Sequence, residues 1–306
     1  MIVPALDNAV KSLLMRAGVE NPAGDAKEIL CAVLACDRAQ LLLREEEIPD
    51  PLCEKAIAMA HRRAGGEPIQ YILGSWSFMG RDYKVGEGVL IPRDDTEVVV
   101  AEALKLCERT PDPVIADLCA GSGIIAVTLA KELPNATVYA VEKSDTAFSY
   151  LTENIALNHA KVNAIHADLQ DCVSEFSDGS LDMIVSNPPY IRSAEIAGLQ
   201  QEVQYEPRLA LDGGEDGYDF YKMILTLWTP KLKDGGSIAF EIGEGQFDAI
   251  AEMLKSAGYA DIIGTPDIQN ITRTITAKKA PFPKGAVADT CVTRLRVDTL
   301  LSNAIK

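Results

Sequence analysis

The sequence predicts an α/β fold in which a mostly parallel sheet is covered by helices on both faces. One pattern in the sequence supports this fold class. From about residue 114 onward, short apolar runs alternate with stretches of helical periodicity. Strands and helices that alternate in this way build parallel sheets. The chain of 306 residues is long enough for about two domains, and a helical segment precedes the alternating part.

Residues 1–72 are predicted to form a compact helical domain. Apolar residues recur at helical spacing within 9–18, 24–36 and 51–66, and Gly or Pro stands at the ends of these stretches. Residues 73–92 contain aromatic and β-branched side chains interrupted by Gly, and they are predicted to form a β-hairpin linker.

The alternating part is predicted to be one domain that spans residues 93–279 and opens with a helix near 95–109. Its strands are expected at 114–118, 137–142, 162–167, 181–186 and 237–243, with two short runs at 260–265 and 271–278. The helices between them are expected at 123–133, 145–158, 220–232 and 247–258. Residues 280–306 have no place in this scheme and are treated as a C-terminal extension of unknown role.

Charge and composition disfavour several classes of protein. The chain has 45 acidic and 29 basic residues and a net charge of -16, which does not fit a protein that grips a long phosphate backbone. There is no signal-peptide pattern and no apolar run long enough to cross a membrane, so a cytoplasmic protein is expected. The seven cysteines form no C-x-x-C pair and indicate reduced, buried thiols. His61, His159 and His166 lack metal-ligand spacing, so no metal site is expected.

The stretch "DLCAGSG" places a glycine loop where the first strand meets the first helix. Gly121 and Gly123 allow a tight turn and a close approach to a ligand, and the following helix offers backbone N–H groups. The second strand ends at Glu142, where a carboxylate can bind both hydroxyls of a ribose. Together these features indicate a ligand that contains adenosine. Because no third glycine and no Walker lysine follow, a dinucleotide and a nucleoside triphosphate are disfavoured.

Asp168 follows the third strand, where its carboxylate can accept a hydrogen bond from an adenine amino group. The glycine loop and the acids after the second and third strands resemble the pattern of class I S-adenosylmethionine-dependent methyltransferases, which have a Rossmann-like domain. The resemblance implies S-adenosyl-L-methionine as cofactor. The residues that it implies for cofactor binding are Asp117, Cys119, Ala120, Gly121, Gly123, Glu142, Asp168 and Asn187.

The stretch "SNPPYI" follows the fourth strand. A strand-ending turn is the simple explanation of Pro188 and Pro189, because neither can donate a backbone hydrogen bond. The fourth strand is expected beside the first, where the strand order reverses and ligands bind. A planar nitrogen must be held in line with a methyl donor before it can be methylated. Asn187 can offer its side-chain carbonyl, Pro188 its backbone carbonyl and Tyr190 a flat face for this purpose.

Six segments make the sequence resemble the release-factor glutamine methyltransferases, which modify the glutamine of the Gly-Gly-Gln motif in class 1 peptide chain release factors. The segments are "EPIQYILGSWSF" (67–78), "LIPRDDTE" (90–97), "DLCAGSG" (117–123), "VSNPPYI" (185–191), "YEPRLALDGGEDG" (205–217) and "FEIGEGQ" (240–246). The resemblance implies that Asn187, Pro188 and Tyr190 are catalytic and bind the substrate amide. Pro189, Arg93 and Glu206 are implied as further substrate-binding residues, although a salt link that holds the loops is an alternative for Arg93 and Glu206.

The same resemblance implies methyl transfer to a glutamine side-chain amide, which modulates translation termination. The helical domain of residues 1–72 is expected to dock the release factor. We expect a monomer that binds no nucleic acid directly. A glutamine methyltransferase of a ribosomal protein and a nucleic-acid amino-methyltransferase remain alternatives. A non-catalytic cofactor-binding protein is disfavoured, because the Asn-Pro-Pro-Tyr motif is intact.

Two features depart from the family pattern. Asp94 stands where the family usually has Pro between the Arg and Asp of its "IPRPDTE" segment. Residues 280–306 have no counterpart in the family, and an added helix that packs against the domain is slightly favoured over a partner contact or a disordered end.

Overall fold

The computed structural model describes residues 1–281, which form two compact units. The smaller unit comprises residues 1–92 and 194–211, and the larger comprises residues 93–193 and the described residues from Asp212 to 281. Nearly all of the C-terminal extension, from residue 282, lies outside the described residues. No helix within residues 1–281 is both long enough and apolar enough to cross a membrane.

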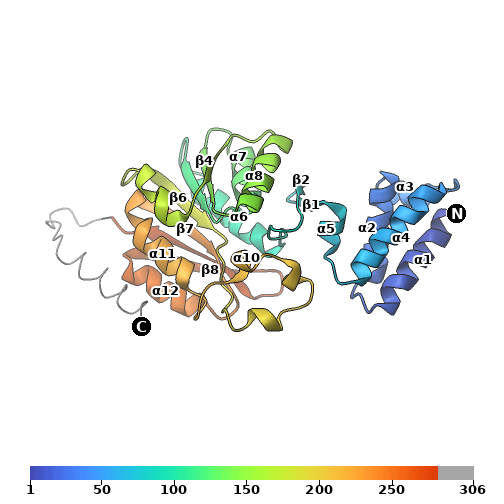
Figure 1. Cartoon of the computed structure of the whole chain (residues 1–306). Helices are drawn as coiled ribbons and strands as arrows, with labels where there is room; N and C mark the ends of the chain where they lie inside the picture. The colour runs from blue at the N-terminus through green and yellow to red at the C-terminus, as the bar shows by residue number, and fades with distance from the viewer. Residues whose placement is uncertain (282–306) are drawn as a thin grey trace. The chain divides into compact units, whose positions relative to one another are not determined.

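The smaller unit is built from helices (Figure 1). They are α1 (Val3–Arg16), α2 (Pro22–Leu34), α3 (Arg38–Leu43), α4 (Asp50–Ala64) and α5 (Ile69–Leu73). Leu6, Leu14 and Ile29 are completely buried between the longer helices and belong to one apolar core. Beside this core, the buried guanidinium of Arg63 on α4 forms an ion pair of 2.6 Å with Asp25 on α2. The apolar stripes and this ion pair explain how the helices pack against one another.

A short β-hairpin follows the helices of the smaller unit. Its strands are β1 (Ser75–Phe78) and β2 (Arg81–Lys84), which pair antiparallel. Met79 and Gly80 both have positive φ angles, of 46° and 73°, which match the two-residue turn that suits the twist of a hairpin. The hairpin is shorter than the predicted linker of residues 73–92, because its two strands span only eight residues, 75–78 and 81–84.

Residues 194–211 differ from the sequence-based prediction, which placed them in the domain of residues 93–279. They form η2 (Ile196–Gly198), η3 (Val203–Tyr205) and α10 (Arg208–Leu211). In the structure they belong to the smaller unit. The carboxylate of Glu202 accepts a hydrogen bond of 2.5 Å from Arg63, and this ion pair is one reason for the grouping. Sequence periodicity does not reveal such a contact, because the two residues lie 139 positions apart.

The larger unit contains a seven-stranded sheet with the order β5-β4-β3-β6-β7-β9-β8. Its strands are β3 (Val114–Leu118), β4 (Thr137–Glu142), β5 (Val162–His166), β6 (Leu181–Ser186), β7 (Leu232–Glu241), β8 (Tyr259–Pro266) and β9 (Thr272–Lys279). The five strands from β3 to β7 are parallel to their neighbours, whereas β9 pairs antiparallel with β7 and β8. This topology confirms the predicted mostly parallel sheet and its α/β, Rossmann-like class.

Helices cover both faces of this sheet, as predicted (Figure 1). They are α6 (Asp95–Cys107), α7 (Ile124–Glu132), α8 (Asp145–Leu157), α9 (Leu169–Cys172), α11 (Asp219–Leu227) and α12 (Phe247–Ser256), with 3-10 turns η1 (Val173–Glu175) and η4 (Thr229–Lys231). α6 lies against β6, β7 and β9 and beside α7. α9, α11 and α12 share a core with the strands, in which Trp228 is fully buried and donates a hydrogen bond of 3.2 Å to the Leu169 carbonyl.

The boundary between α11 and β7 differs from the prediction. The expected helix over 220–232 ends at Leu227, and β7 begins at Leu232 instead of residue 237. Pro230 explains the early end of the helix, since proline cannot donate the helical hydrogen bond and restricts the residue before it. The chain instead passes through η4 and enters the sheet five residues earlier than predicted.

Candidate active site

The glycine loop and the Asn-Pro-Pro-Tyr segment leave the sheet at the same edge. β3 and β6 are parallel neighbours, and Leu118 at the end of β3 pairs with Ser186 at the end of β6. The Ser186 hydroxyl donates a hydrogen bond of 2.5 Å to the Leu118 carbonyl. The glycine loop starts directly after Leu118, and Asn187 follows Ser186. The sheet order reverses between these strands, so the predicted position of the segment at a topological switch point is confirmed.

The glycine loop contains three residues with left-handed backbone, Cys119 (φ 60°), Gly121 (φ 56°) and Gly123 (φ 85°). A Cβ on Gly123 would lie 2.4 Å from the Leu151 Cδ1 atom, so the packing of α8 against the loop requires glycine there. A Cβ on Gly121 would meet no atom within 4 Å among the described residues. The space in front of Gly121 is therefore open and can accept a ligand.

Glu142 ends β4 and is only 9% exposed. Its carboxylate accepts hydrogen bonds from the backbone N–H of Gly121 at 2.8 Å and of Ser144 at 2.7 Å. Burial raises the pKa of Glu142, while these backbone hydrogen bonds act to lower it. Each carboxylate oxygen has a second lone pair, so the group can still accept hydroxyl protons. The glycine loop and Glu142 together fit the ribose of an adenosine-containing cofactor.

Asp168 caps the short helix α9 next to this loop. Its carboxylate accepts a hydrogen bond of 3.0 Å from the Gln170 N–H and pairs with the Lys143 ammonium at 2.7 Å. Burial acts to raise the pKa of Asp168, but the Gln170 and Lys143 contacts outweigh it and lower that pKa below its usual value. Asp168 therefore carries a negative charge at neutral pH.

Asp117 lies beneath the glycine loop. It is completely buried, and its Oδ2 atom accepts a hydrogen bond of 2.9 Å from the Ala126 N–H in α7. Its Oδ1 atom has no hydrogen-bond partner within residues 1–281. Burial raises the pKa of Asp117 well above its ordinary value. The buried carboxyl group holds the start of α7 to β3 and so supports the loop, and Ala120 within the loop is also buried.

Asn187 is half-buried and is held by the start of α6. Its Nδ2 atom donates a hydrogen bond of 3.3 Å to the hydroxyl of Thr96, the second residue of that helix. Its Oδ1 atom accepts no hydrogen bond from any of the described residues. Pro188 and Pro189 are buried behind it. Asn187 therefore has one end of its amide anchored and the other free to bind a substrate.

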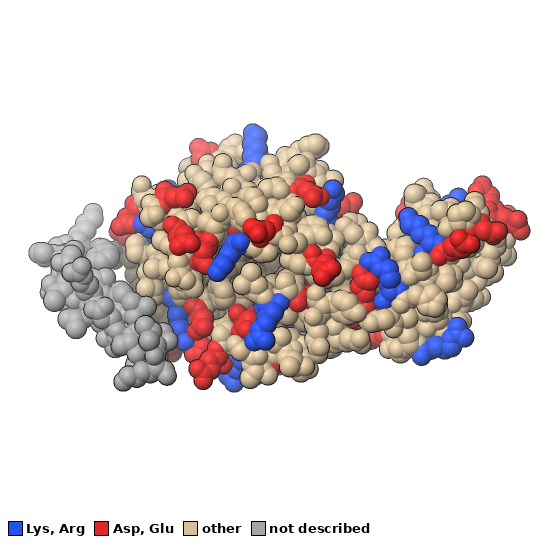
Figure 2. Space-filling view, viewed as in Figure 1, with Lys and Arg blue, Asp and Glu red and all other residues tan. Residues whose placement is uncertain are grey.

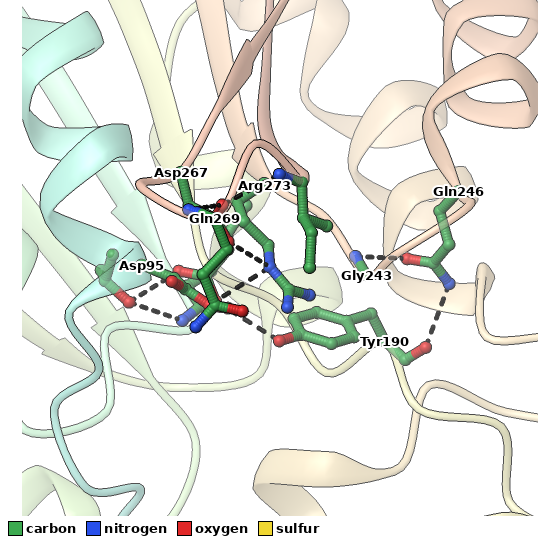
Figure 3. A network of polar contacts seen from close by, with 11 residues as sticks. Asp95, Tyr190, Gly243, Gln246, Asp267, Gln269 and Arg273 are labelled. Carbon is green, nitrogen blue, oxygen red and sulfur yellow. Dashed lines mark hydrogen bonds and ion pairs between the residues drawn. The ribbon is translucent and has the colours of Figure 1, made fainter.

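Tyr190 lies near Gln246 and Gly243 (Figure 3). Gln246 donates a hydrogen bond of 3.1 Å from Nε2 to the Tyr190 carbonyl, and its Oε1 atom accepts one of 2.8 Å from the Gly243 N–H. A Cβ on Gly243 would lie 3.1 Å from the Tyr190 ring. A Cβ on Gly213 would lie 2.8 Å from the carbonyl oxygen of Pro189. These contacts fix the backbone and the ring of Tyr190.

Glu241, at the end of β7, joins the residues that hold Asn187 and Tyr190. It is 1% exposed. Its Oε2 atom accepts a hydrogen bond of 2.6 Å from the Thr96 hydroxyl, and its Oε1 atom accepts one of 3.4 Å from the Tyr190 hydroxyl. Burial is the largest influence and raises the pKa of Glu241 to about 7. The nearby carboxylate of Asp95 also raises this pKa, whereas the two hydroxyls and Arg273 lower it.

An ion-pair network borders this site (Figure 3). The Nε atom of Arg273 on β9 lies 3.2 Å from a carboxylate oxygen of Asp95 on α6 and 3.2 Å from one of Asp267. Asp267 also accepts backbone hydrogen bonds from Gln269 and Ile271 in the turn between β8 and β9. The network fixes the start of α6, and hence Thr96, against the antiparallel end of the sheet.

Arg93 and Glu206 belong to different units. Glu206 is 5% exposed, and its Oε2 atom accepts a hydrogen bond of 3.0 Å from the Ile91 N–H within the smaller unit. Arg93 is half-buried at the start of the larger unit. Their role in substrate binding stays a prediction.

The backbone at Asp94 has a conformation that would also accept proline, the residue that the family usually has at this position. Its φ angle is −62°, within the range that proline imposes. An acidic side chain at this position also interacts favourably with the N-terminal end of α6. The replacement therefore alters the charge before the helix and leaves its start in place.

Thr96, Glu241 and Gln246 are the site residues that sequence reasoning did not single out. All three lie in segments that carry the family resemblance, "LIPRDDTE" and "FEIGEGQ". Their position in these segments could have indicated them, but it assigned no role to any of the three. Their contacts join α6, β7 and the Asn-Pro-Pro-Tyr segment, which only the folded chain brings together.

The six cysteines within residues 1–281 are free thiols. Burial raises the pKa of Cys119, the cysteine of the glycine loop, far above its ordinary value. In the part of the chain that the structure describes, no group of His, Cys, Asp and Glu residues could hold a metal ion.

The chain is similar to known methyltransferases. The PrmC N-terminal domain family matches residues 5–74, and the methyltransferase small domain family matches residues 96–209. The release factor glutamine methyltransferase of Geobacter sulfurreducens is 40% identical over 271 residues, which are 87% of this chain and 92% of that protein. The protein of the same name from Thermodesulfovibrio yellowstonii is 38% identical over 84% of this chain and 92% of its own.

Among solved structures, the hMettl16 catalytic domain is similar with a TM-score of 0.53 and 17% sequence identity, over 78% of this chain and 84% of that chain. At this identity the similarity supports the methyltransferase fold alone. The curated relatives extend over most of both chains at far higher identity. The chain belongs to the release factor glutamine methyltransferases.

Proposed function

We propose that this protein transfers a methyl group from S-adenosyl-L-methionine to the side-chain amide nitrogen of the Gly-Gly-Gln glutamine in class 1 peptide chain release factors. Family membership supports this activity. The observation that carries it is the position of Asn187, whose side-chain amide is anchored by Thr96 at the sheet edge where the glycine loop also begins. Methylation of this glutamine modulates translation termination.

The cofactor-binding residues of this proposal, apart from Asn187, lie on the β3 to β5 side of the switch point. S-adenosylmethionine, when bound, supplies an electrophilic methyl group on a sulfonium centre. Glu142 would accept hydrogen bonds from the ribose hydroxyls, and Asp168 would accept one from the adenine amino group. Gly121 and Gly123, with the adjoining Cys119 and Ala120, would let the backbone approach the cofactor closely.

The substrate-binding residues have to overcome the weak nucleophilicity of an amide nitrogen, whose lone pair is delocalised. Asn187 can accept one N–H of the substrate glutamine through Oδ1, and Pro188 can accept the other through its backbone carbonyl. The flat ring of Tyr190 would flank the amide plane. Holding both N–H groups fixes the nitrogen in the orientation for transfer, which is the main contribution that these residues can make. The proton that leaves the methylated amide would pass to water or to a nearby acceptor.

The helical part of the smaller unit is proposed to dock the release factor, because a protein substrate requires contacts beyond one glutamine. Leu42 and Leu43 on α3 are 79% and 82% exposed and offer apolar surface for such contacts. Changing both to Ser should raise the KM for release factor about tenfold and leave the affinity for S-adenosylmethionine unchanged. Leu157→Ser, at an exposed leucine of the larger unit, is the matched control. An unchanged KM in the double variant would contradict docking through α3.

Charge disfavours the alternative of a nucleic-acid amino-methyltransferase. On the face shown in Figure 2, Lys and Arg side chains are scattered singly among acidic ones, and no continuous basic groove is visible there. The net charge of -16 agrees with this view.

We infer that the protein acts as a monomer in the cytoplasm, where release factors work. Sedimentation equilibrium should return the mass of one chain, and a dimer would contradict this inference.

Mass spectrometry of a purified release factor, after incubation with this protein and S-adenosylmethionine, tests the proposal. The expected result is one added methyl group on the glutamine of the Gly-Gly-Gln motif, absent from a version with Ala in place of that glutamine. Ribosomal proteins and short DNA and RNA substrates are assayed in parallel. Methylation of one of these, with the release factor unmodified, would transfer the activity to the corresponding alternative.

A further inference from the structure

The hydroxyl of Thr96 lies between a buried carboxylate and the side-chain amide of Asn187. Thr96 is completely buried in the first turn of α6. Its hydroxyl donates a hydrogen bond of 2.6 Å to the Oε2 atom of Glu241, a distance typical of a strong bond to an ionised acceptor. A hydroxyl has a single proton to donate. Once that proton points at Glu241, the oxygen of Thr96 can only accept.

This direction of donation determines which end of the Asn187 amide faces Thr96. The two ends of an asparagine amide have nearly the same shape, so packing alone distinguishes them poorly. Only the NH2 end can donate to an oxygen that is restricted to accepting, and the Nδ2 atom of Asn187 lies 3.3 Å from the Thr96 oxygen. The Oδ1 atom therefore points away from Thr96. It is then available for an N–H group of a substrate amide.

We propose that Thr96 and Glu241 are positioning residues, which hold the Asn187 amide in the one orientation that presents its carbonyl oxygen to the substrate glutamine. The inference rests on the proposed function, since it assigns the direction of the amide that binds that glutamine. Thr96 and Glu241 touch neither substrate nor cofactor in this account. They act through Asn187.

Glu241 also links the other polar side chain of the motif to the same carboxylate. Its Oε1 atom accepts a hydrogen bond of 3.4 Å from the Tyr190 hydroxyl. A carboxylate presents two acceptor oxygens and no donor, so it can accept from both hydroxyls together. A glutamine side chain of the same shape would confront one hydroxyl with an NH2 group. Glu241→Gln should therefore disturb the direction of donation while preserving the packing.

A purely structural role for the same contacts has different consequences. Thr96 connects α6 to β7 through Glu241, and loss of that bond could only loosen the helix against the sheet. Such loosening would lower the melting temperature whichever way the Asn187 amide points, so the transfer rate and the Asn187 NH2 signal distinguish the two roles. Thr274, the cross-strand neighbour of Glu241 on β9, provides the matched comparison. It is also completely buried, but its hydroxyl has no partner among residues 1–281.

The experiment compares Thr96→Val, Thr96→Ser, Glu241→Gln and Thr274→Val in the full chain. The single-turnover rate of release-factor methylation is measured at saturating substrate and cofactor, beside the dissociation constant for S-adenosylmethionine and the melting temperature. Thr96→Val and Glu241→Gln should each slow transfer about 10- to 100-fold, with cofactor affinity unchanged. Thr96→Ser, which keeps the hydroxyl, should transfer within about threefold of the rate of the unmodified protein, and Thr274→Val should transfer at the unmodified rate. The Thr96→Val/Glu241→Gln double variant should be no slower than the slower single one, because both changes break the same chain.

A second readout does not depend on the activity. In a chain with 15N-labelled asparagine, the Asn187 side-chain NH2 signal, assigned by its loss in Asn187→Asp, should be protected from exchange. It should lose that protection in Thr96→Val and keep it in Thr274→Val. Unchanged NMR protection in Thr96→Val would overturn the inference, as would unmodified transfer rates in both Thr96→Val and Glu241→Gln. If the unmodified protein failed to methylate a release factor, the proposed function would fail, while the NMR result would still decide the orientation of Asn187.

Discussion

Glu142 and Glu241 end two strands of the same sheet, and both are almost fully buried, at 9% and 1% exposure. They differ in what they bind. Glu142 accepts hydrogen bonds from backbone N–H groups of Gly121 and Ser144. Glu241 accepts hydrogen bonds from the side-chain hydroxyls of Thr96 and Tyr190. One carboxylate therefore shapes a loop on the proposed cofactor side, and the other orients side chains on the proposed substrate side.

The comparison shows that burial alone does not determine the role of a carboxylate. Backbone N–H groups are fixed donors, so Glu142 is held wherever the loop folds. Hydroxyl groups rotate and can both donate and accept, so the charge on Glu241 decides which way they point. A change at Glu142 should therefore affect binding of the cofactor, and a change at Glu241 should affect the rate of transfer.

Asn187→Ala should remove the side-chain amide that Thr96 and Glu241 position. Methyl transfer should fall more than about 100-fold, the size of effect typical when one oriented hydrogen-bonding group is lost from a transition state. The dissociation constant for S-adenosylmethionine, measured by isothermal titration calorimetry, should change less than about twofold. An equal loss of rate and cofactor affinity would show that Asn187 is not specific to the substrate side.

Glu142→Ala should have the opposite pattern. It removes the proposed ribose acceptor and leaves the Gly121 N–H without its partner, so cofactor affinity should fall more than about tenfold, or about 1.4 kcal/mol. The single-turnover rate at saturating cofactor should fall much less. Calorimetry and rapid-quench kinetics measure the two quantities. A loss of affinity below twofold would remove Glu142 from the cofactor site.

The charge of Glu241 predicts a dependence of the rate on pH. Burial raises the pKa of this acid to about 7, so it is protonated below that pH and ionised above it. Protonation gives one of its oxygens a hydrogen that it can donate, so only the ionised form is restricted to accepting from both Thr96 and Tyr190. The transfer rate should therefore rise with pH through about 7, falling up to tenfold for each pH unit below the pKa. The charged or titratable groups that face Glu241 are Asp95 on α6, Arg273 on β9 and Tyr190 itself.

Glu241→Gln is the control for this profile, since a glutamine does not titrate. Its lower rate should be constant between about pH 6 and 8. Titration of Glu241 also makes the stability of the fold depend on pH. Because the folded chain holds the Glu241 proton more tightly than the unfolded chain does, the contribution of this group to folding falls as pH rises from the unfolded pKa through about 7. A rate profile that persists unchanged in Glu241→Gln would assign the pH dependence to another group.

The smallest effect is expected at Thr274. Its buried hydroxyl has no hydrogen-bond partner in the described part of the chain, so Thr274→Val removes an unsatisfied polar group at nearly constant volume. The free energy of unfolding should rise by about 1 kcal/mol. The same change at Thr96, which breaks a hydrogen bond to a buried carboxylate, should lower it by about 1–3 kcal/mol. Urea denaturation measures both, and a destabilised Thr274→Val would show that its hydroxyl has a partner after all.

Local patterns in the sequence were sufficient to predict the strands of the switch point. The predicted strands 114–118, 137–142 and 181–186 have the observed ends. Gly121, Glu142 and Pro188 stand at or within three residues of these ends. Glu142 was identifiable for the same reason, since it accepts hydrogen bonds from Gly121 and from Ser144, and only 21 and 2 residues separate it from them.

Glu241 was not identifiable in this way. Its partner Thr96 is 145 residues away, and no periodicity relates a helix start to the end of a strand so distant in sequence. The shift of residues 194–211 to the smaller unit has the same origin, in contacts such as that of Glu202 with Arg63. The sequence therefore predicts features that depend on nearby residues, whereas contacts between side chains distant in sequence are seen only in the folded chain.

The division between the two carboxylates is tested most directly by measuring cofactor affinity and single-turnover methyl transfer on the same preparations of Glu142→Gln and Glu241→Gln. Both changes are isosteric and remove one charge. We predict opposite effects in the two variants: Glu142→Gln weakens S-adenosylmethionine binding and retains most of the rate at saturation, whereas Glu241→Gln binds the cofactor normally and transfers slowly. If both variants lost affinity and rate in the same proportion, the two carboxylates would not serve separate sides of the site.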